Sequence, residues 1–446
     1  MLDIKFIRQN ADKVKQGAKN KGIEVDIDRL LQLDQMRRDF LQQTEDLRAK
    51  QNKLSKTKPD SQTIKELQQL KLKLKGLEQN FNDIEAEYKD LLLLVPNIPS
   101  DKMPVGKGED DNPVLRAWRP DKGYLAEKKL KHPKDTVKLM PELPLHSGDK
   151  KFKPKHHIEL GVELDLIDNE QSAKVSGSRF CYLKNEAVLM QYGLLDIMMK
   201  KLIKTGFKPM IVPLLVKADA LYGTSHFPGD QEQVYKIEKE NVEENQQLYL
   251  VGSSEPSLFA YYMDKILNEA DLPQKMFAYS SCFRSEVGSW GRDVRGIKRV
   301  HQFDKLEMDV VCSPEQSDQI YEELLAINEW LLQQLELPYH LVNKCSGDAG
   351  YYATHYQCDP EVWLPGQGEF MEVMTDTNTS DYQARRLNIK YIDKKTGEKK
   401  YCHTVNDTGV AMGRMLIAII DNYQQADGSV KVPKILQSYV GKERIG

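Results

Sequence analysis

The sequence predicts an α+β protein, in which an N-terminal pair of long antiparallel helices precedes a larger unit of antiparallel strands flanked by helices. Three observations support this fold class. Leucines near the N-terminus recur at coiled-coil spacing, two alternating runs flank a loop in the middle of the chain, and apolar segments around them have the length of buried helices. With 446 residues, the chain can bury a large core and form roughly one to three domains.

The clearest periodic signal lies before residue 95. Apolar residues from Leu67 to Leu91 alternate three and four positions apart, which is the seam of a coiled coil. Leucine or phenylalanine also recurs at every seventh position from Leu33 to Leu54. Between these segments, residues 58–61 (KPDS) combine a helix-breaking proline with residues suited to cap the next helix. We therefore expect an antiparallel helical hairpin that projects as an arm.

The polar surface near the tip of this hairpin is basic. Its cations outnumber the local acids and are Arg48, Lys50, Lys53, Lys56, Lys58, Lys65, Lys71, Lys73 and Lys75. They form either an ordinary solvated surface or a surface that contacts a phosphate backbone. Because the net charge of the chain is only −3, any affinity for nucleic acid must come from such local patches and not from a global field.

The stretch 282–307, CFRSEVGSWGRDVRGIKRVHQFDKLE, carries most of the chemistry. Two alternating runs flank a loop, which predicts a β-hairpin with a long turn. Alternation places Arg284 and Glu286 on one face of the first strand. On the second strand, one face carries Arg299, His301, Phe303, Lys305 and Glu307. The loop adds more cationic charge than a structural turn needs, from Arg292, Arg295 and Lys298.

Arginines beside a flat aromatic ring suit a polyphosphate that is joined to a planar base. A guanidinium group binds phosphate as a fork, and the ring can stack on the base. For an isolated FRxE sequence, a solvated hairpin with a charged outer face is the alternative.

The composition predicts a soluble cytoplasmic protein without a structural zinc ion. The N-terminal segment is charged and lacks an apolar signal core, and no apolar run approaches the length of a membrane span. The cysteines form no CxxC pair and no cluster at zinc spacing, which is typical of a reduced compartment. They are Cys181, Cys282, Cys312, Cys345, Cys358 and Cys402.

The hairpin stretch resembles motif 2 of the class II aminoacyl-tRNA synthetases, and SEVGSWGRDVRGIKRVHQFDKLE is most similar to seryl-tRNA synthetases. The strings IELGVELDLID, AKVSGSRFCYLKNEAVLMQYGL and TVNDTGVAMGRM extend the likeness over most of the chain. It implies a coiled-coil tRNA-binding arm over 1–100 and a class II catalytic domain with an antiparallel sheet over 101–446. Motif 1, through which the class forms a homodimer, is expected near 187–216, motif 2 near 279–308 and motif 3 near 403–436.

The resemblance also implies the ligands of individual residues. Arg284 and Arg414 are the expected catalytic residues. ATP would be bound by Arg284, Glu286, Arg299, Phe303, Glu372 and Arg414. Serine would be bound by Ser253, Glu255, Arg284, Glu307, Asn406 and Thr408. A Mg²⁺ ion beside ATP would be held by Glu372 and Thr375. The tRNA would be bound by Arg48, Lys50, Lys53, Lys56, Lys71, Lys73 and Lys75. Taken alone, Ser253 and Glu255 equally suit a helix N-terminus, and Arg414 an internal ion pair.

The implied activity is the ATP-dependent, AMP-forming attachment of L-serine to tRNA(Ser), with tRNA(Sec) as a further candidate. The sequence departs from the family in two places. An additional segment near 122–153 is expected to be a surface insertion. In 371–378, Met371 replaces a common arginine, while Met374 and Asp376 replace small residues, which puts the shape of the amino-acid pocket in question.

Two other functions fit parts of the sequence. A catalytically silent synthetase paralogue that binds tRNA or a protein would explain the unusual strand, although such a protein has no need for all the charged motif residues. An enzyme that activates an amino acid for a carrier protein would leave the basic arm without a ligand.

Overall fold

The computed structural model describes residues 1–55, 60–125, 132–148, 152–238, 243–287, 296–349 and 352–446. The chain divides into two compact units, a helical unit (Met1–Ile98) and a sheet unit (Pro99–Gly446). Among the described residues, no helix has the length and apolar character that crossing a bilayer requires. All six cysteines lie within the described ranges and are free thiols.

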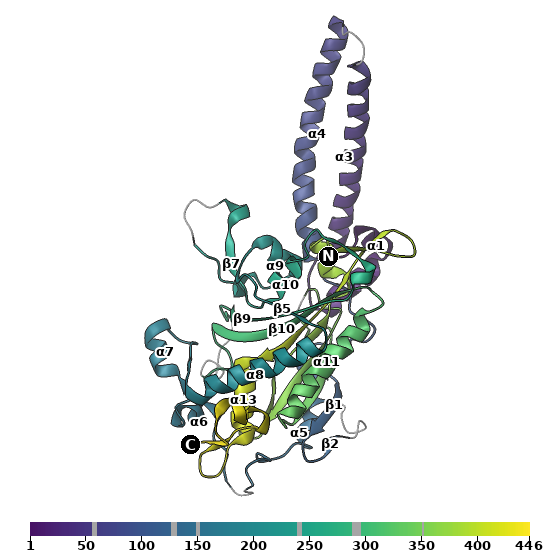
Figure 1. The fold of residues 1–446 in the computed structure, drawn as a ribbon. Coiled ribbons are helices and arrows are strands. Elements are labelled where there is room, and N and C mark those ends of the chain that lie inside the picture. Colours follow the sequence, from purple (N-terminus) through teal and green to yellow (C-terminus); the bar gives the residue numbers. More distant parts are fainter. Residues whose placement is uncertain (56–59, 126–131, 149–151, 239–242, 288–295, 350–351) are drawn as a thin grey trace. The chain divides into compact units, whose positions relative to one another are not determined.

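The helical unit contains the predicted hairpin. The helices α1 (Ile4–Gln9) and α2 (Ala11–Asn20) precede α3 (Ile27–Leu54) and α4 (Ser61–Leu94), which lie side by side and antiparallel (Figure 1). The Asp60 carboxylate caps α4 by accepting a hydrogen bond from the Thr63 amide at 2.7 Å. The predicted helical hairpin is therefore confirmed, and its turn, 56–59, lies outside the described residues.

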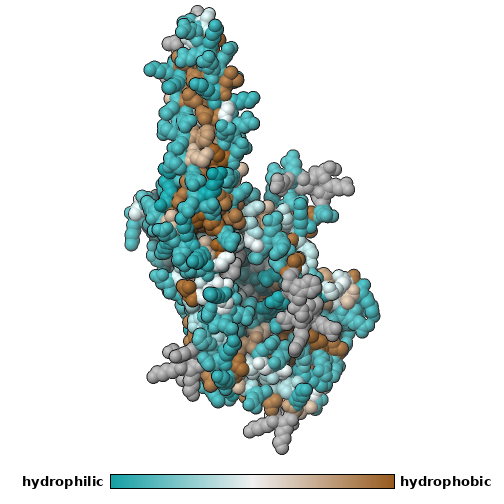
Figure 2. Space-filling model, turned by 180° about the vertical axis from the view of Figure 1, so that it is seen from behind, coloured by the Kyte–Doolittle hydropathy of each residue, from teal (hydrophilic) through white to brown (hydrophobic). Residues whose placement is uncertain are grey.

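Both apolar contacts and ion pairs join α3 to α4. The seam buries Leu70, Leu74, Tyr88 and Leu92 of α4, and Figure 2 shows hydrophobic side chains gathered along this line while hydrophilic ones cover the rest of the helices. Interhelical ion pairs follow the seam: Arg29–Glu87 at 2.7 Å, Arg37–Glu85, and Arg48–Glu78 at 3.0 Å.

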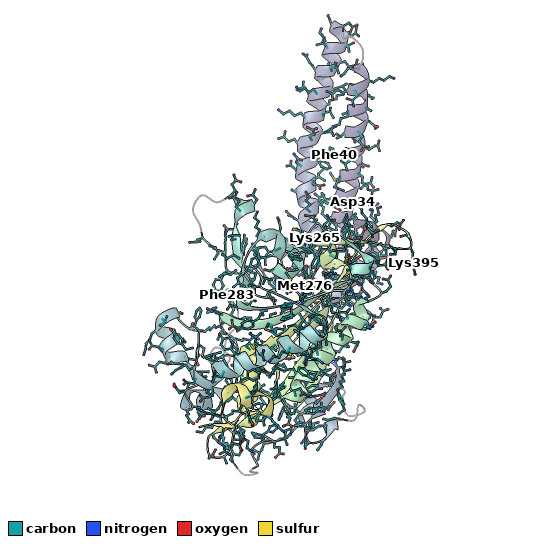
Figure 3. All side chains as sticks on the ribbon, in the orientation of Figure 1. Asp34, Phe40, Lys265, Met276, Phe283 and Lys395 are labelled. Atoms are coloured by element: carbon teal, nitrogen blue, oxygen red, sulfur yellow. The ribbon has the colours of Figure 1, made fainter. Side chains whose placement is uncertain are left out.

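The base of this hairpin is fastened by a buried acid. Asp34 lies on α3, where Figure 3 labels it. It is 3.0 Å from Arg8 of α1 and 3.4 Å from Arg38. Because a buried carboxylate needs a paired cation, this contact fixes α1 against α3.

An antiparallel sheet forms the centre of the sheet unit, as predicted. Its ten described strands pair antiparallel except for β5 with β9. In spatial order they are β2 (Gly123–Tyr124), β1 (Val114–Arg119), β11 (Tyr339–Asn343), β12 (Tyr356–Leu364), β14 (Asp376–Asn378), β17 (His403–Ala411), β10 (Gln302–Cys312), β9 (Gln274–Phe283) and β5 (Lys208–Met210), with β13 (Glu369–Glu372) paired to β12.

Smaller strand pairs and helices surround this sheet. The strands are β3 (Ile167–Asp168) with β4 (Tyr182–Leu183), β6 (Leu215–Lys217) with β7 (Leu248–Leu250), β8 (Ile266–Asn268) with β15 (Lys390–Ile392) and β16 (Lys399–Tyr401), and β18 (Val430–Lys431) with β19 (Arg444–Ile445). The helices are α5 (Pro133–Val137), α6 (His157–Glu163), α7 (Asn169–Ser176), α8 (Asn185–Lys204), α9 (Ala218–Thr224), α10 (Glu255–Ala260), α11 (Ser317–Gln334), α12 (Tyr382–Arg386), α13 (Met412–Tyr423) and α14 (Gln437–Val440).

The two faces of the sheet have different roles. On β10, Leu306, Met308 and Val310 point to one face and pack with α8, α11 and α13 in the main core (Figure 1). The opposite face carries Phe303, Lys305 and Glu307 and opens into a pocket, beside a smaller core that includes α10 and α12. Helix α13 begins at Met412, directly after the last residue of β17. Gly409 lies within β17, where a Cβ atom would come 2.7 Å from Leu306.

The central hairpin is confirmed, but its strands are shorter than predicted. β9 ends at Phe283 and β10 begins at Gln302, so Arg284, Glu286, Arg299 and His301 belong to the connection. Glu286 has a left-handed φ of 50°, which a strand residue does not adopt, so the first strand cannot continue through it. His301 does not line the pocket with Phe303, Lys305 and Glu307, and its Nδ1 atom contacts the Tyr235 hydroxyl at 3.0 Å.

The additional segment near 122–153 is not simply a surface insertion. Met140 is buried with Val114, Ala117 and Trp363, and the Trp363 indole donates a hydrogen bond to the carbonyl oxygen of Pro141 at 2.8 Å. Residues 126–131 and 149–151 lie outside the described residues. The expectation of a surface loop is wrong for 133–148, because this part carries apolar residues that complete the core at the sheet edge.

A pair of buried carboxyl groups lies on the core face of the sheet. Asp376 of β14 is directly opposite Asp407 of β17, and the Asn328 amide donates to both Asp407 oxygens at 2.8 Å. The carboxylate oxygens of Asp376 accept no hydrogen bond from the described residues. Burial and the neighbouring Asp407 raise the pKa of Asp376 well above its ordinary value.

We expect Asp376→Asn to stabilise the protein increasingly as pH rises. The folded-state pKa of Asp376 is raised above its unfolded value, so the wild type loses stability with rising pH above about 4, by at most about 1.4 kcal/mol per pH unit. Urea unfolding of both proteins between pH 5 and pH 8 measures this difference. The control is Asp427→Asn, because hydrogen bonds from Ser429 lower the pKa of Asp427. A stability difference for Asp376→Asn that is constant over this range contradicts the prediction.

Candidate active site

A pocket of about 670 Å³ opens on the face of the sheet that carries Phe303, Lys305 and Glu307. Every residue predicted to bind ATP, serine or Mg²⁺ lines it: Ser253, Glu255, Arg284, Glu286, Arg299, Phe303, Glu307, Glu372, Thr375, Asn406, Thr408 and Arg414. They come from segments far apart in the sequence, and the register of the sheet joins them. Glu307 is opposite Thr408, and Asn406 is opposite Thr377.

Arg284 is held at the end of the central hairpin. It follows Phe283, the last residue of β9 (Figure 3), and its amide donates to the His301 carbonyl oxygen at 3.0 Å. The guanidinium Nε donates to the Gly252 carbonyl oxygen at 3.2 Å, and the guanidinium carbon lies 5.4 Å from the centroid of the Phe303 ring. These contacts place a forked cation against an aromatic face at the pocket wall.

One end of the pocket is acidic. Glu255, the first residue of α10, accepts a hydrogen bond from Gln383 Nε2 at 2.7 Å. Glu307 forms an ion pair with Lys305, and both side chains are buried. Burial and the nearby Glu307 raise the pKa of Glu255 to about 8. Burial also raises the pKa of Glu307, while Lys305 opposes this rise. Two buried carboxyl groups compensated by few cations favour the binding of a further cation.

Ser253 makes a contact at a helix N-terminus, which was the alternative that the sequence offered to a role in binding serine. Its hydroxyl oxygen accepts a hydrogen bond from the Glu255 amide at 3.2 Å, at the beginning of α10. Ser253 therefore stabilises the start of this helix while it also lines the pocket.

Another part of the pocket wall contains Arg414. This residue lies in the first turn of α13 and donates from Nη1 to the backbone oxygen and to Oε1 of Glu372, both at 2.9 Å. The Thr375 hydroxyl donates to the same Oε1 at 3.2 Å. The internal ion pair considered for Arg414 is thus present, but its partner is another pocket residue. Carboxylate and hydroxyl oxygens together fit Mg²⁺, which prefers oxygen ligands. Among the described residues, no cluster of three or more His, Cys, Asp or Glu could hold a metal ion on its own.

The unusual residues of 371–378 do not line the pocket. Met371 and Met374 are buried in the main core, and Asp376 points to the same side, opposite Asp407. Glu372, Thr375 and Thr377 line the pocket instead. The departures from the family pattern therefore fall in the core.

The predicted tRNA-binding cations lie on α3 and α4, apart from Lys56, which is outside the described residues. Those that the structure describes are exposed: Arg48, Lys50, Lys53, Lys71, Lys73 and Lys75. Arg48 also binds Glu78. Arg292 and Arg295 of the central loop lie outside the described residues, whereas Lys298 lines the pocket 3.5 Å from Glu369.

The sequence analysis assigned no role to three further residues at the acidic end: Lys305, Gln383 and His226. Lys305 could have been found, because it alternates with Phe303 and Glu307 on β10. Gln383 belongs to α12, and His226 belongs to the segment after α9. No local sequence pattern connects either residue with Glu255, and Gln383 is 128 positions away from it.

Comparisons with known proteins agree with this arrangement. The seryl-tRNA synthetase N-terminal domain family matches residues 1–99, and the family "tRNA synthetase class II core domain (G, H, P, S and T)" matches residues 235–423. The chain is 38% identical to a protein named "Serine--tRNA ligase" from Dictyoglomus turgidum, over 100% of this chain and 99% of the relative. It is also 38% identical to the protein of that name from Treponema denticola, over the full length of both.

Solved structures give the same result. A seryl-tRNA synthetase from Pyrococcus horikoshii, complexed with ATP, has a TM-score of 0.86 and 33% identity, with 100% of this chain and 99% of that chain covered. A cytoplasmic serine-tRNA ligase from Naegleria fowleri in complex with AMP has a TM-score of 0.82 and 29% identity, with 100% and 98% covered. The full-length identity, both family domains and the shared fold lead to one conclusion: the chain belongs to the seryl-tRNA synthetase family.

Proposed function

We propose that this protein activates L-serine with ATP and transfers the serine to the 3′ end of tRNA(Ser). The observation that carries the proposal is the single pocket in which all residues predicted for ATP, serine and Mg²⁺ come together, in a chain that is similar over its full length to serine–tRNA ligases. The first step joins serine to AMP. In the second, a ribose hydroxyl at the 3′ end of tRNA loses its proton and attacks the seryl carbonyl carbon, the bond from this carbon to the phosphate oxygen breaks, and AMP leaves.

In the first step, a carboxylate oxygen of serine attacks the α-phosphorus of ATP. A bond forms between this oxygen and phosphorus, the bond from the α-phosphorus to the bridging oxygen breaks, and pyrophosphate leaves. Because the carboxylate is already ionised, no general base is needed, and catalysis depends on positioning and charge neutralisation. Arg284 is assigned to both the α-phosphate and the serine carboxylate, which its forked donors can contact together.

The remainder of ATP occupies the other predicted positions. Phe303 stacks on adenine, Glu286 accepts from its exocyclic amine, and Arg299 supports the phosphates. Arg414 binds the γ-phosphate. Glu372 and Thr375 would hold Mg²⁺, which would supply positive charge beside the phosphate tail. The contact of Arg414 with Glu372 in the free protein keeps the arginine at the pocket wall before ATP arrives.

Serine is selected at the acidic end. Its ammonium group is attracted to Glu255, and its hydroxyl group binds within the set formed by Glu307, Ser253, Asn406 and Thr408. Alanine would leave these buried polar groups without a partner, so we expect strong discrimination against it. Threonine must be excluded by shape.

Other features of the family are extended to this chain as proposals. The basic α3–α4 hairpin, within residues 1–100, binds tRNA through its phosphate backbone, and tRNA(Sec) is a further candidate substrate. The protein acts in the cytoplasm as a homodimer formed through motif 1. Exposed apolar side chains in this region support a dimer: Leu189 and Tyr192 of α8 are 42% and 58% exposed, and Ile211 is fully exposed.

The decisive experiment is ATP–pyrophosphate exchange without tRNA, with serine, threonine, alanine and glycine as separate substrates. We expect exchange with serine and at most a small fraction of that rate with the others. Exchange with a different amino acid would overturn the assigned specificity. The absence of exchange in folded, ATP-binding protein would favour the silent paralogue, which currently has little support because the unusual residues of 371–378 lie in the core.

A further inference from the structure

We propose that His226 binds the α-ammonium group of the substrate together with Glu255, an inference that rests on the function proposed above. His226 follows α9 and lines the pocket, with 15% of its side chain exposed. Its Nε2 atom lies 3.9 Å from Oε2 of Glu255. The two side chains therefore border the same small part of the acidic end.

The hydrogen bonds of Thr224 determine which nitrogen of His226 carries the proton. The Thr224 hydroxyl donates to the Ala220 carbonyl oxygen at 3.0 Å, which uses its only hydrogen. His226 Nδ1 lies 2.9 Å from the same hydroxyl oxygen, and we infer that Nδ1 is the donor in this contact. In a neutral imidazole with the proton on Nδ1, Nε2 is an acceptor.

The surroundings of His226 keep the ring neutral. Burial, together with the positive charges of Arg284 and Lys305, lowers its pKa to about 3. The ring is therefore neutral at every pH near neutrality, and its Nε2 atom lies 3.9 Å from Oε2 of Glu255 at the pocket wall.

Gln383 fixes the spacing between the two acceptors. Its Nε2 group donates to Oε1 of Glu255 at 2.7 Å and to the carbonyl oxygen of Thr224 at 3.1 Å. One amide thus ties the start of α10 to the end of α9, the helix that positions His226. Because Gln383 binds Oε1, the Oε2 atom is the one that faces His226.

When Glu255 is ionised, the form that a bound cation favours, its Oε2 atom and Nε2 of His226 are two acceptors 3.9 Å apart. They suit a ligand group that can donate to both at once. A hydroxyl group has a single hydrogen and can donate to only one of them, whereas a primary ammonium group has three. Its positive charge also complements the carboxylate of Glu255. The α-ammonium group is the part of serine with these properties, which distinguishes this subsite from that of the serine hydroxyl.

The test compares two ligands that differ only in this group. One is the sulfamoyl analogue of seryl-adenylate, and the other is the same compound without the α-amino group. Isothermal titration of the full-length protein measures both. Relative to wild type, His226→Phe should bind the amino compound between about tenfold and a hundredfold more weakly, the range for hydrogen bonds to charged groups. Binding of the des-amino compound should change less than about twofold.

Two further variants separate ligand binding from packing. His226→Asn keeps a donor near the position of Nδ1 but has no atom at Nε2, so it should show the same selective loss. His226→Gln can place its amide oxygen near the position of Nε2 and should recover most of the affinity. Serine KM should rise in His226→Phe while ATP KM stays the same.

If His226→Phe lost affinity equally for both compounds, His226 would only shape the pocket. If its affinity for both were unchanged, His226 would not touch the ligand. Either result overturns the proposal. Failure of the wild type to bind either compound would instead refute the proposed function, and this inference with it.

Discussion

Arg284→Ala is expected to lower serine-dependent ATP–pyrophosphate exchange by a factor of about 10²–10³. Removal of one charged group from the reacting centre typically raises the barrier by about 3–4 kcal/mol, and Arg284 is assigned to both reacting groups. The side chain is prepositioned by the Gly252 carbonyl oxygen and the Phe303 ring, so its charge needs little reorganisation when ATP and serine bind. Exchange rates at saturating serine and ATP measure the effect on kcat.

Two matched variants make this result specific. Arg284→Lys keeps the charge but loses the fork, so it should recover only part of the rate. Arg444→Ala removes an arginine from an exposed ion pair with Asp427. Neither residue lines the pocket, so this change should alter exchange less than about twofold. An Arg284→Ala enzyme that retained more than about a fifth of the wild-type kcat would contradict the assigned role.

The sequence correctly predicted the features whose pattern repeats within one helix or one strand. The coiled coil was visible because its seam repeats within each helix, and α3 and α4 follow it. Phe303 and Glu307 could be placed on one face because a strand alternates with a period of two. Arg284 and Glu286 were correctly expected together, yet they reach the pocket from an irregular connection and not from a strand.

The strand 371–378 shows where alternation fails. Counting by two from Glu372 would place Met374 and Asp376 in the pocket. The structure interrupts the strand between β13 and β14, which shifts the alternation by one residue and moves both side chains into the core. This shift is set by pairing with β12 and β17, so the sequence of the strand alone does not reveal it.

Contacts between distant segments also could not be found from local patterns. The segment 133–148 packs because Trp363, 222 positions from Pro141, lies over it. His226 likewise joins the pocket through the contacts of Thr224 and Gln383, which meet only in the folded chain.

Shortening the α3–α4 hairpin is expected to abolish tRNA charging and to leave amino-acid activation intact. A variant in which a short glycine-containing turn replaces residues 45–80 removes the predicted tRNA-binding cations. It retains the Arg29–Glu87 and Arg37–Glu85 ion pairs and the contact of Asp34 with Arg8. Because the pocket residues all belong to the sheet unit, serine-dependent exchange should stay within about twofold of wild type. Charging of tRNA(Ser) should fall below detection at tRNA concentrations that saturate the wild type.

A charge variant tests whether the hairpin binds tRNA through the phosphate groups of the tRNA backbone. Three lysines are exposed on α4: Lys71, Lys73 and Lys75. Replacing all of them by glutamine should weaken tRNA binding. It should also reduce the slope of log affinity against log salt concentration by about 0.7–0.9 for each phosphate group that is no longer neutralised. The same change at Lys5, Lys13 and Lys19, on the short helices α1 and α2, alters the net charge equally and should leave the slope unchanged. If both triple variants weakened binding to the same extent, the effect would be one of overall charge. A shortened hairpin that still charged tRNA at the wild-type rate would exclude the hairpin as the tRNA-binding element.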